Sequence, residues 1–203
     1  MVGADVAEDA FAAALEGGDV ASVILSPVSS DDERLDEAAF LARAKALVPV
    51  AQAMGTAAIV AFEPRVAARA GADGVHLDGI HGEADIERLH HEMSVGIGNL
   101  NDRHGALAAG ERPIDYVFFG RLQRDMRPDP HPRNLKLAQW WSEIVTLPCI
   151  VSAGSQMDSL VPAARTGADF VALQKAIFAA HDPAEAVARA NALLDEHAPV
   201  FDG

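Results

Sequence analysis

Short apolar runs alternate with amphipathic segments along almost the whole chain. Seven of these runs are rich in β-branched or large apolar residues, which is typical of strands buried in a parallel sheet. They span residues 20–26, 57–62, 73–77, 94–99, 115–120, 148–153 and 169–173. The pattern therefore predicts seven strands, each followed by a helical segment.

The predicted helices follow the strands at residues 33–47, 64–70, 84–93, 101–109, 134–145, 156–166 and 183–196, and a further helix at 5–16 precedes the first strand. This alternation predicts an α/β fold, a (β/α)8 TIM barrel formed by residues 1–203 as a single domain. Eight helices with seven strands indicate a first strand that is short or missing at the N-terminus. Three explanations stay open: a truncated start, irregular pairing of residues 1–4, or a gap that solvent or another chain covers.

One short run occurs twice. Residues 69–77 (RAGADGVHL) resemble residues 165–173 (RTGADFVAL), and the copies lead into the third and seventh predicted strands. Strands four units apart are what duplication of a half-barrel would produce. The alternative is recurrent helix-stop chemistry, in which Gly ends a helix and Ala-Asp starts a strand.

Composition and charge narrow the classes of partner. Half of the residues are hydrophobic but only 5% are aromatic, and the formal net charge is -14. This charge repels nucleic acid and anionic membrane surfaces, so neither is expected as a partner, and a phosphorylated ligand needs a local positive site. The single cysteine, Cys149, cannot form an internal disulfide, and no run approaches the ~20 apolar residues of a membrane span. A cytoplasmic location is therefore expected.

In such a barrel the residues that end the strands face a common mouth, where function is expected. Gly154 and Ser155 follow the sixth predicted strand, and Gln174 and Lys175 follow the seventh. Adjacent loops and a short helix at 174–180 can direct backbone N–H groups at a phosphate, and glycine lets the backbone approach closely. The alternative is that Gly154 and Ser155 only make a turn and cap the next helix.

Charged side chains near the mouth suggest two further elements. The loop at 121–133 carries Arg121 and Arg124, and arginine forks suit the oxygens of a second phosphate, with salt bridges inside the loop as the alternative. Glu63 and Asp78 end consecutive strands and form a candidate Mg²⁺ site, because Mg²⁺ often takes one or two carboxylates plus ligand phosphates.

Several runs resemble those of a known family: GADGVHL at 71–77, DYVFFG at 115–120, GADFVA at 167–172, AIF at 176–178 and DP at 182–183. In order and spacing they are similar to thiamine phosphate synthases and thiazole tautomerases, over roughly residues 50–190. The resemblance implies a barrel that joins a hydroxymethylpyrimidine diphosphate to a thiazole phosphate and releases diphosphate with the help of Mg²⁺.

Several residues that this family uses are replaced. Leu25–Ser29 stands where the synthases carry Gln-x-Arg-x-Lys, and Ala61-Phe62 stands where they carry Asn-Asp. Their Pro-Thr-x-Thr-Lys loop corresponds to residues 124–128, and the histidine of the tautomerases falls on Arg121. The family's Gly-Gly is represented by Gly154-Ser155.

Together these features predict a divergent thiamine phosphate synthase-like protein. It would bind a phosphorylated thiazole-type ligand at the predicted phosphate site, and any transfer would use the two loop arginines on the diphosphate. Two alternatives stay open: a non-enzymatic sensor of such a ligand, and a phosphosugar isomerase or epimerase with Asp78 or His76 as its base. An exposed partner in the pair Trp140-Trp141 would mark the interface of a homo-oligomer.

Overall fold

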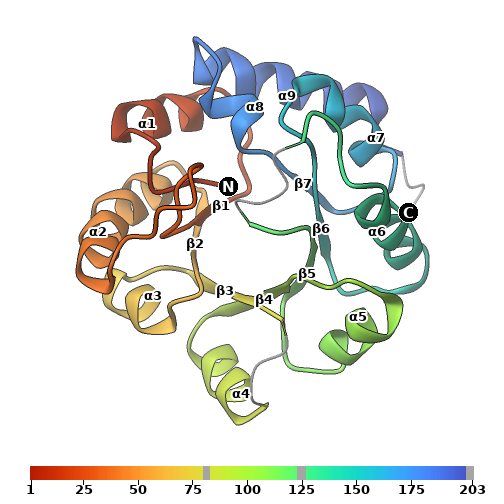
Figure 1. Cartoon of the computed structure of the whole chain (residues 1–203), viewed down its shortest axis with the longest axis horizontal. Coiled ribbons are helices and arrows are strands. Elements are labelled where there is room, and N and C mark those ends of the chain that lie inside the picture. Colours follow the sequence, from red (N-terminus) through yellow and green to blue (C-terminus); the bar gives the residue numbers. More distant parts are fainter. Residues whose placement is uncertain (80–82, 123–126, 200–203) are drawn as a thin grey trace.

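The computed structural model describes residues 1–79, 83–122 and 127–199. The described residues form a sheet of parallel strands in the sequential order β1 to β7, which curls into a barrel (Figure 1). The strands are β1 (Ser22–Leu25), β2 (Ala57–Ala61), β3 (Gly74–Asp78), β4 (Ser94–Gly98), β5 (Tyr116–Phe119), β6 (Cys149–Ser152) and β7 (Phe170–Ala172). Each overlaps its predicted apolar run, so the TIM-barrel-like fold is confirmed.

Helices cover the outer face of the sheet (Figure 1). They are α1 (Glu8–Glu16), α2 (Glu37–Ala53), α3 (Pro64–Ala70), α4 (Glu83–Glu92), α5 (Arg103–Gly110), α6 (Pro132–Ile144), the 3-10 helix η1 (Met157–Ser159), α7 (Leu160–Ala164), α8 (Lys175–Phe178) and α9 (Pro183–His197). Asp36, Asp102 and Asp182 cap three of them, because each carboxylate accepts a backbone N–H of the first turn. Within the described ranges, no helix is both long and apolar enough to cross a bilayer.

The first residues of the chain pair between β1 and β7. Val2 forms a parallel bridge to Leu25, and its N–H donates to the Ile24 carbonyl at 2.9 Å while its carbonyl accepts from the Ser26 N–H at 2.9 Å. On the other side, the Met1 amino nitrogen donates to the Leu173 carbonyl at 2.7 Å. Irregular pairing of residues 1–4 is therefore the arrangement observed.

Three aspartates hold the amino-terminal ends of the strands in register. Asp73, Asp115 and Asp169 immediately precede β3, β5 and β7, and the carboxylate of each accepts an N–H from the preceding strand at 2.7 to 2.8 Å. The donors are Ala58, Val95 and Cys149. Because Asp115 lies outside the repeated run and does the same, recurrent local chemistry accounts for the aspartate of the Gly-Ala-Asp repeat, and duplication of a half-barrel stays the alternative for the run as a whole.

Glycines of β4 make room for two large side chains inside the barrel. A Cβ atom on Gly96 would lie 1.9 Å from Cζ of Tyr116, and one on Gly98 would lie 2.6 Å from Nε2 of His76. Around these rings the interior is closed by a buried apolar cluster of Ile24, Ile59, Ala61, Phe118, Leu122 and Ile150. The alternation of glycine and aliphatic residues in β4 thus fits one large residue on each neighbouring strand.

The tryptophan pair packs on the outside of the sheet. Trp141 is 1% exposed, and its Nε1 donates to the Leu147 carbonyl at 2.8 Å. Trp140 is half-buried, with the Arg103 guanidinium 4.8 Å from its ring centroid. Trp141 therefore packs on the barrel wall, and Trp140 is its partly exposed neighbour.

Candidate functional site

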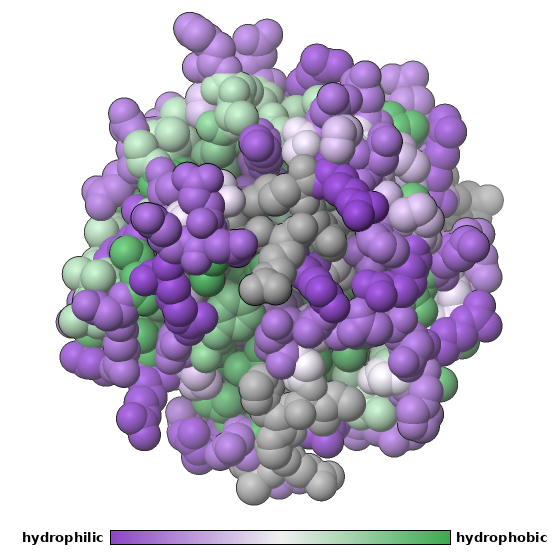
Figure 2. Space-filling view, viewed as in Figure 1, coloured by the Kyte–Doolittle hydropathy of each residue, from purple (hydrophilic) through white to green (hydrophobic). Residues whose placement is uncertain are grey.

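The predicted site residues stand at the carboxyl ends of the strands, on one mouth of the barrel. Glu63 and Asp78 belong to the ends of β2 and β3, Arg121 follows β5, and Gly154 and Gln174 follow β6 and β7. The view along the barrel axis shows a mostly hydrophilic surface, with hydrophobic residues visible between the polar groups left of the centre (Figure 2). The parallel order of the strands brings these segments to one edge.

Gly154 and Gln174 leave neighbouring strands at the same level. The register pairs Ser152 with Ala172, two residues earlier on each strand, and the Ala153 N–H donates to the Ala172 carbonyl at 3.0 Å. Gln174 is 6% exposed, and its carbonyl accepts the N–H groups of the first turn of α8 at 2.9 and 3.0 Å. The short helix expected at 174–180 is therefore present as α8, with the exposed Lys175 as its first residue.

The turn at Gly154 is packed against the loop that follows β5. A Cβ atom on Gly154 would lie 2.1 Å from the Pro128 carbonyl oxygen, so the close approach that requires glycine here is to another part of the chain. The Ser155 N–H donates to the Arg127 carbonyl at 2.7 Å, and the Gln156 N–H donates to the Pro128 carbonyl at 3.4 Å. The Ser155 amide is therefore already engaged, whereas the Gly154 N–H has no acceptor among the described residues.

Arg121 is anchored between two strand ends. Its Nε donates to Oδ1 of Asn99 at 2.9 Å, and the Asn99 N–H donates to the Gly120 carbonyl at 3.3 Å. Asn99 has φ 56°, a left-handed conformation that asparagine tolerates better than most residues. The exposed Arg121 side chain is thus held at the mouth through its Nε. Arg124 lies outside the described residues.

Glu63 is paired with an arginine that the sequence pattern did not single out. Arg34 Nη2 lies 2.7 Å from Glu63 Oε1, and the Arg34 guanidinium lies 6.0 Å from the ring centroid of Phe62. Arg34 lies in the segment after β1, where it forms an isolated antiparallel β-bridge with Val28. A signal for this residue existed, because Arg34 is the single cation between residues 26 and 36. Its partner, 29 positions away, could be found only in the fold.

Asp78 is the second carboxylate of the predicted Mg²⁺ site. Glu63 and Asp78 each stand two residues beyond Ala61 and His76, which are paired in the sheet, so they leave neighbouring strands side by side. No group of three or more His, Cys, Asp or Glu side chains suited to a metal ion occurs in the part of the chain that the structure describes. The two carboxylates therefore suit Mg²⁺ only if the phosphates of a bound ligand supply further oxygen ligands.

His76 lies below the mouth, inside the barrel. The side chain is 1% exposed, its Nδ1 is 3.1 Å from the Tyr116 hydroxyl, and the Phe118 ring meets it edge-on with centroids 5.3 Å apart. Burial lowers the pKa of His76 to about 3, so its imidazole is neutral at pH 7 and a weak base. This environment disfavours His76 as the base of an isomerase.

Comparisons with known proteins agree with this architecture. A family model described as thiamine monophosphate synthase matches residues 4–177. The thiamine-phosphate synthase of Rhodospirillum centenum is 34% identical over 189 residues, covering 91% of this chain and 88% of that protein. The thiamine-phosphate synthase of Hyphomonas neptunium is 31% identical over 185 residues, covering 89% and 83%. In fold, the chain is similar to the thiamine phosphate pyrophosphorylase of Pyrococcus furiosus, with a TM-score of 0.76, 19% identity, and coverage of 93% and 89%. The chain therefore belongs to the thiamine monophosphate synthase family.

Proposed function

We propose that this chain acts in thiamine biosynthesis as a transferase that joins a thiazole phosphate to a hydroxymethylpyrimidine diphosphate and releases diphosphate. Family membership and the names of relatives aligned over 91% and 89% of the chain support the pathway. The location of the site is supported by the register of β6 and β7, which sets Gly154 beside Gln174 at the mouth.

The thiazole phosphate would bind at this edge. The N–H groups of Gly154, Lys175 and Ala176 have no acceptor among the described residues, whereas the next two N–H groups of α8 bond to the Gln174 carbonyl. α8 has only four residues, so the charge of Lys175 supplies most of the attraction. Ser155 would contribute its N–H only if its bond to Arg127 opened.

The diphosphate would lie on the other side of the mouth. Arg121, which is anchored by Asn99, would contact its oxygens, and Arg124 is proposed as a second contact. Asp78 would hold Mg²⁺ together with diphosphate oxygens, and Glu63 would join it only by releasing Arg34. Mg²⁺, when bound, neutralises charge on the departing diphosphate.

The direct test is product formation. Purified protein is incubated with both precursors, with and without Mg²⁺, and thiamine phosphate is measured by chromatography. We expect Mg²⁺-dependent product, and a kcat/KM lowered on the order of 10- to 100-fold in Gly154→Ala, because the added methyl group displaces the Pro128 turn. Gly105→Ala is the matched control, since its Cβ meets only Asp102 Oδ1 at 3.4 Å. Absence of product at high enzyme concentration would refute the transferase.

A second candidate is a sensor that binds the thiazole phosphate without turnover. Two contacts favour it. The Ser155 N–H already donates to the Arg127 carbonyl, and the Glu63 carboxylate is already paired with the Arg34 guanidinium. Calorimetric titration of the protein with thiazole phosphate separates the candidates. Binding without product indicates the sensor, and binding that is equally strong in wild type and Gly154→Ala would place the ligand elsewhere.

A further inference from the structure

Phe62, the residue that follows β2, has an unusual backbone conformation. Its φ is 67°, in the left-handed region that a bulky side chain rarely adopts, because the Cβ atom comes too close to the following carbonyl oxygen. Its N–H donates to the His76 carbonyl at 2.8 Å, so β3 holds this turn in place. Among the residues that the structure describes, the other non-glycine residues with positive φ are Asp32 and Asn99, whose short polar side chains tolerate it. Phe62 is therefore a strained position.

The left-handed turn places the Phe62 ring on the interior side of the barrel. Side chains alternate along β2, so Val60 joins the core beneath the helices, whereas Ile59 and Ala61 join the interior cluster described above. A regular strand would direct residue 62 to the same side as Val60. Phe62 instead packs against the interior cluster and stays partly exposed. The strain thus accompanies an aromatic ring held at the mouth, and strained residues cluster at functional sites.

Charged groups stand next to this ring. The Arg34 guanidinium lies 6.0 Å from the centroid of the Phe62 ring and pairs with Glu63, and Asp78 leaves the neighbouring strand. The hydrophobic area left of the centre in Figure 2 lies on the side where Figure 1 places β2. A flat ring binds best to another ring in an offset or edge-on arrangement. This part of the mouth therefore suits a ligand that combines a planar ring with a charged group.

We propose that Phe62 is a specificity-determining residue, whose ring stacks against the planar pyrimidine ring of the hydroxymethylpyrimidine diphosphate. This inference rests on the proposed transferase, in which the diphosphate lies near Glu63, Asp78 and Arg121. Phe62 directly precedes Glu63, whereas the thiazole phosphate is placed at the ends of β6 and β7. The pyrimidine is therefore the ring that Phe62 contacts.

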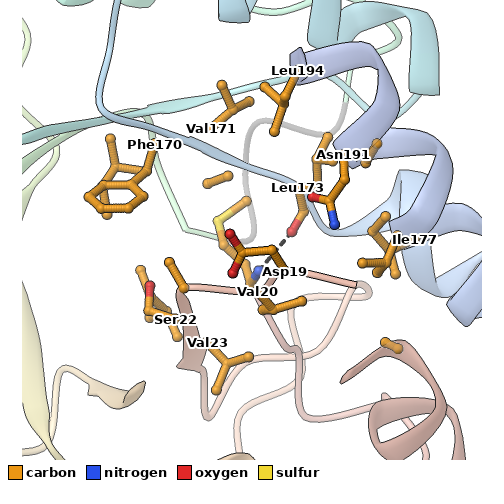
Figure 3. Close-up of a pocket in the computed structure, with 18 of the residues that line it drawn as sticks. Asp19, Val20, Ser22, Val23, Phe170, Val171, Leu173, Ile177, Asn191 and Leu194 are labelled. Carbon is orange, nitrogen blue, oxygen red and sulfur yellow. Dashed lines mark hydrogen bonds between the residues drawn. The ribbon is translucent and has the colours of Figure 1, made fainter. Parts of the chain in front are cut away.

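The competing place for an aromatic ring is an apolar cavity of about 380 Å³ between β1 and β7 (Figure 3). Phe170 lines this cavity and is 45% exposed. The described residues of the lining include Asp19 and Asp169 but no lysine, arginine or histidine, so they repel a diphosphate. Phe170 therefore supplies a matched control for Phe62.

Calorimetric titration tests the contact without relying on turnover. Wild type, Phe62→Leu, Phe62→Tyr and Phe170→Leu are each titrated, in the presence of Mg²⁺, with hydroxymethylpyrimidine diphosphate and separately with inorganic diphosphate. Leucine is apolar but has no aromatic face, so Phe62→Leu should weaken binding of the pyrimidine diphosphate on the order of 10-fold and leave binding of inorganic diphosphate unchanged. Phe62→Tyr and Phe170→Leu should bind both ligands as wild type does.

A second pair of variants tests the backbone conformation on which the inference depends. Phe62→Gly and Phe62→Ala both remove the ring, but only glycine adopts a left-handed φ without a steric cost. The glycine variant should therefore unfold at a temperature roughly 2 to 8 °C above that of the alanine variant. An alanine variant that is equally stable would show that Phe62 is not held in this conformation, and the placement of its ring would fail.

The titrations overturn the proposal if Phe62→Leu weakens both ligands equally, because Phe62 would then only shape the mouth. They also overturn it if Phe62→Leu weakens neither ligand, if wild type does not bind the pyrimidine diphosphate, or if Phe170→Leu is the variant that weakens its binding. Product formation separates this inference from the proposed function. Product made by Phe62→Leu with an unchanged KM for the pyrimidine diphosphate refutes the stacking alone, and ring-dependent binding without product refutes the transferase alone.

Discussion

The buried His76 predicts a specific loss of stability in mild acid. Its side chain is 1% exposed, and burial lowers the pKa to about 3 from a usual value of 6.5. Between pH 6.5 and pH 3 the unfolded chain therefore binds a proton at His76 that the folded chain does not. The contribution of neutral His76 to the free energy of unfolding is fully present above pH 6.5 and falls as the pH decreases toward 3. Between pH 7 and pH 5 this one group costs about 2 kcal/mol, and the value is the same for any folded-state pKa well below 5.

Urea unfolding at pH 7, 6 and 5 tests this magnitude in wild type, His76→Gln and His104→Gln. Glutamine keeps a polar group that can reach the Tyr116 hydroxyl but does not titrate, so His76→Gln should lose about 2 kcal/mol less than wild type between pH 7 and pH 5. His104 is exposed on α5, and its replacement should leave the wild-type pH dependence unchanged. If all three proteins lose stability in parallel, His76 is not buried in its neutral form.

Three further substitutions or reactions test the fold. Asp169→Ala removes the acceptor of the Cys149 N–H at 2.8 Å and should cost about 1–2 kcal/mol in urea unfolding, whereas Asp158→Ala, in an exposed ion pair, should cost less than about 0.5 kcal/mol. Gly96→Ala would place its Cβ 1.9 Å from Tyr116 Cζ and should cost about 1–3 kcal/mol; an unchanged melting temperature would contradict the packing. Burial raises the pKa of the Cys149 thiol to about 12, so native protein should resist iodoacetamide at pH 8 and react only when unfolded, as mass spectrometry would show.

The strands could be predicted from the sequence because each is a local apolar run between helical segments. The predicted helix at 156–166 is instead divided into η1 and α7, which meet between Ser159 and Leu160. The pairing of Val2 with Leu25 could not be predicted, because residues 1–4 are too few to show a period and their partners are distant in sequence.

The parts of the candidate site that follow from strand order could be predicted from the sequence. The parts that depend on contacts between residues distant in sequence could not. Placing Gly154 beside Gln174 needs only two consecutive strands and their register. The sequence also indicated that Gly154 allows a close approach, but the approaching group in the structure is the Pro128 carbonyl, delivered by a loop with no periodic pattern. The pairing of Arg34 with Glu63 depends on the path of another irregular turn.

The two ends of the barrel carry different kinds of sequence similarity. Asp73, Asp115 and Asp169 fix the register at the amino-terminal ends, and two of them lie in the Gly-Ala-Asp runs that resemble the family most clearly. These bonds do not involve the mouth, so the mouth can change without loss of the fold, as the uncharged run Leu25–Ser29 illustrates. The same separation explains how a fold with a TM-score of 0.76 persists at 19% identity. Substitutions of the three aspartates should therefore lower stability and leave the ligand affinity of the folded protein unchanged, whereas Gly154→Ala, whose Cβ would lie 2.1 Å from the Pro128 carbonyl oxygen, should lower both.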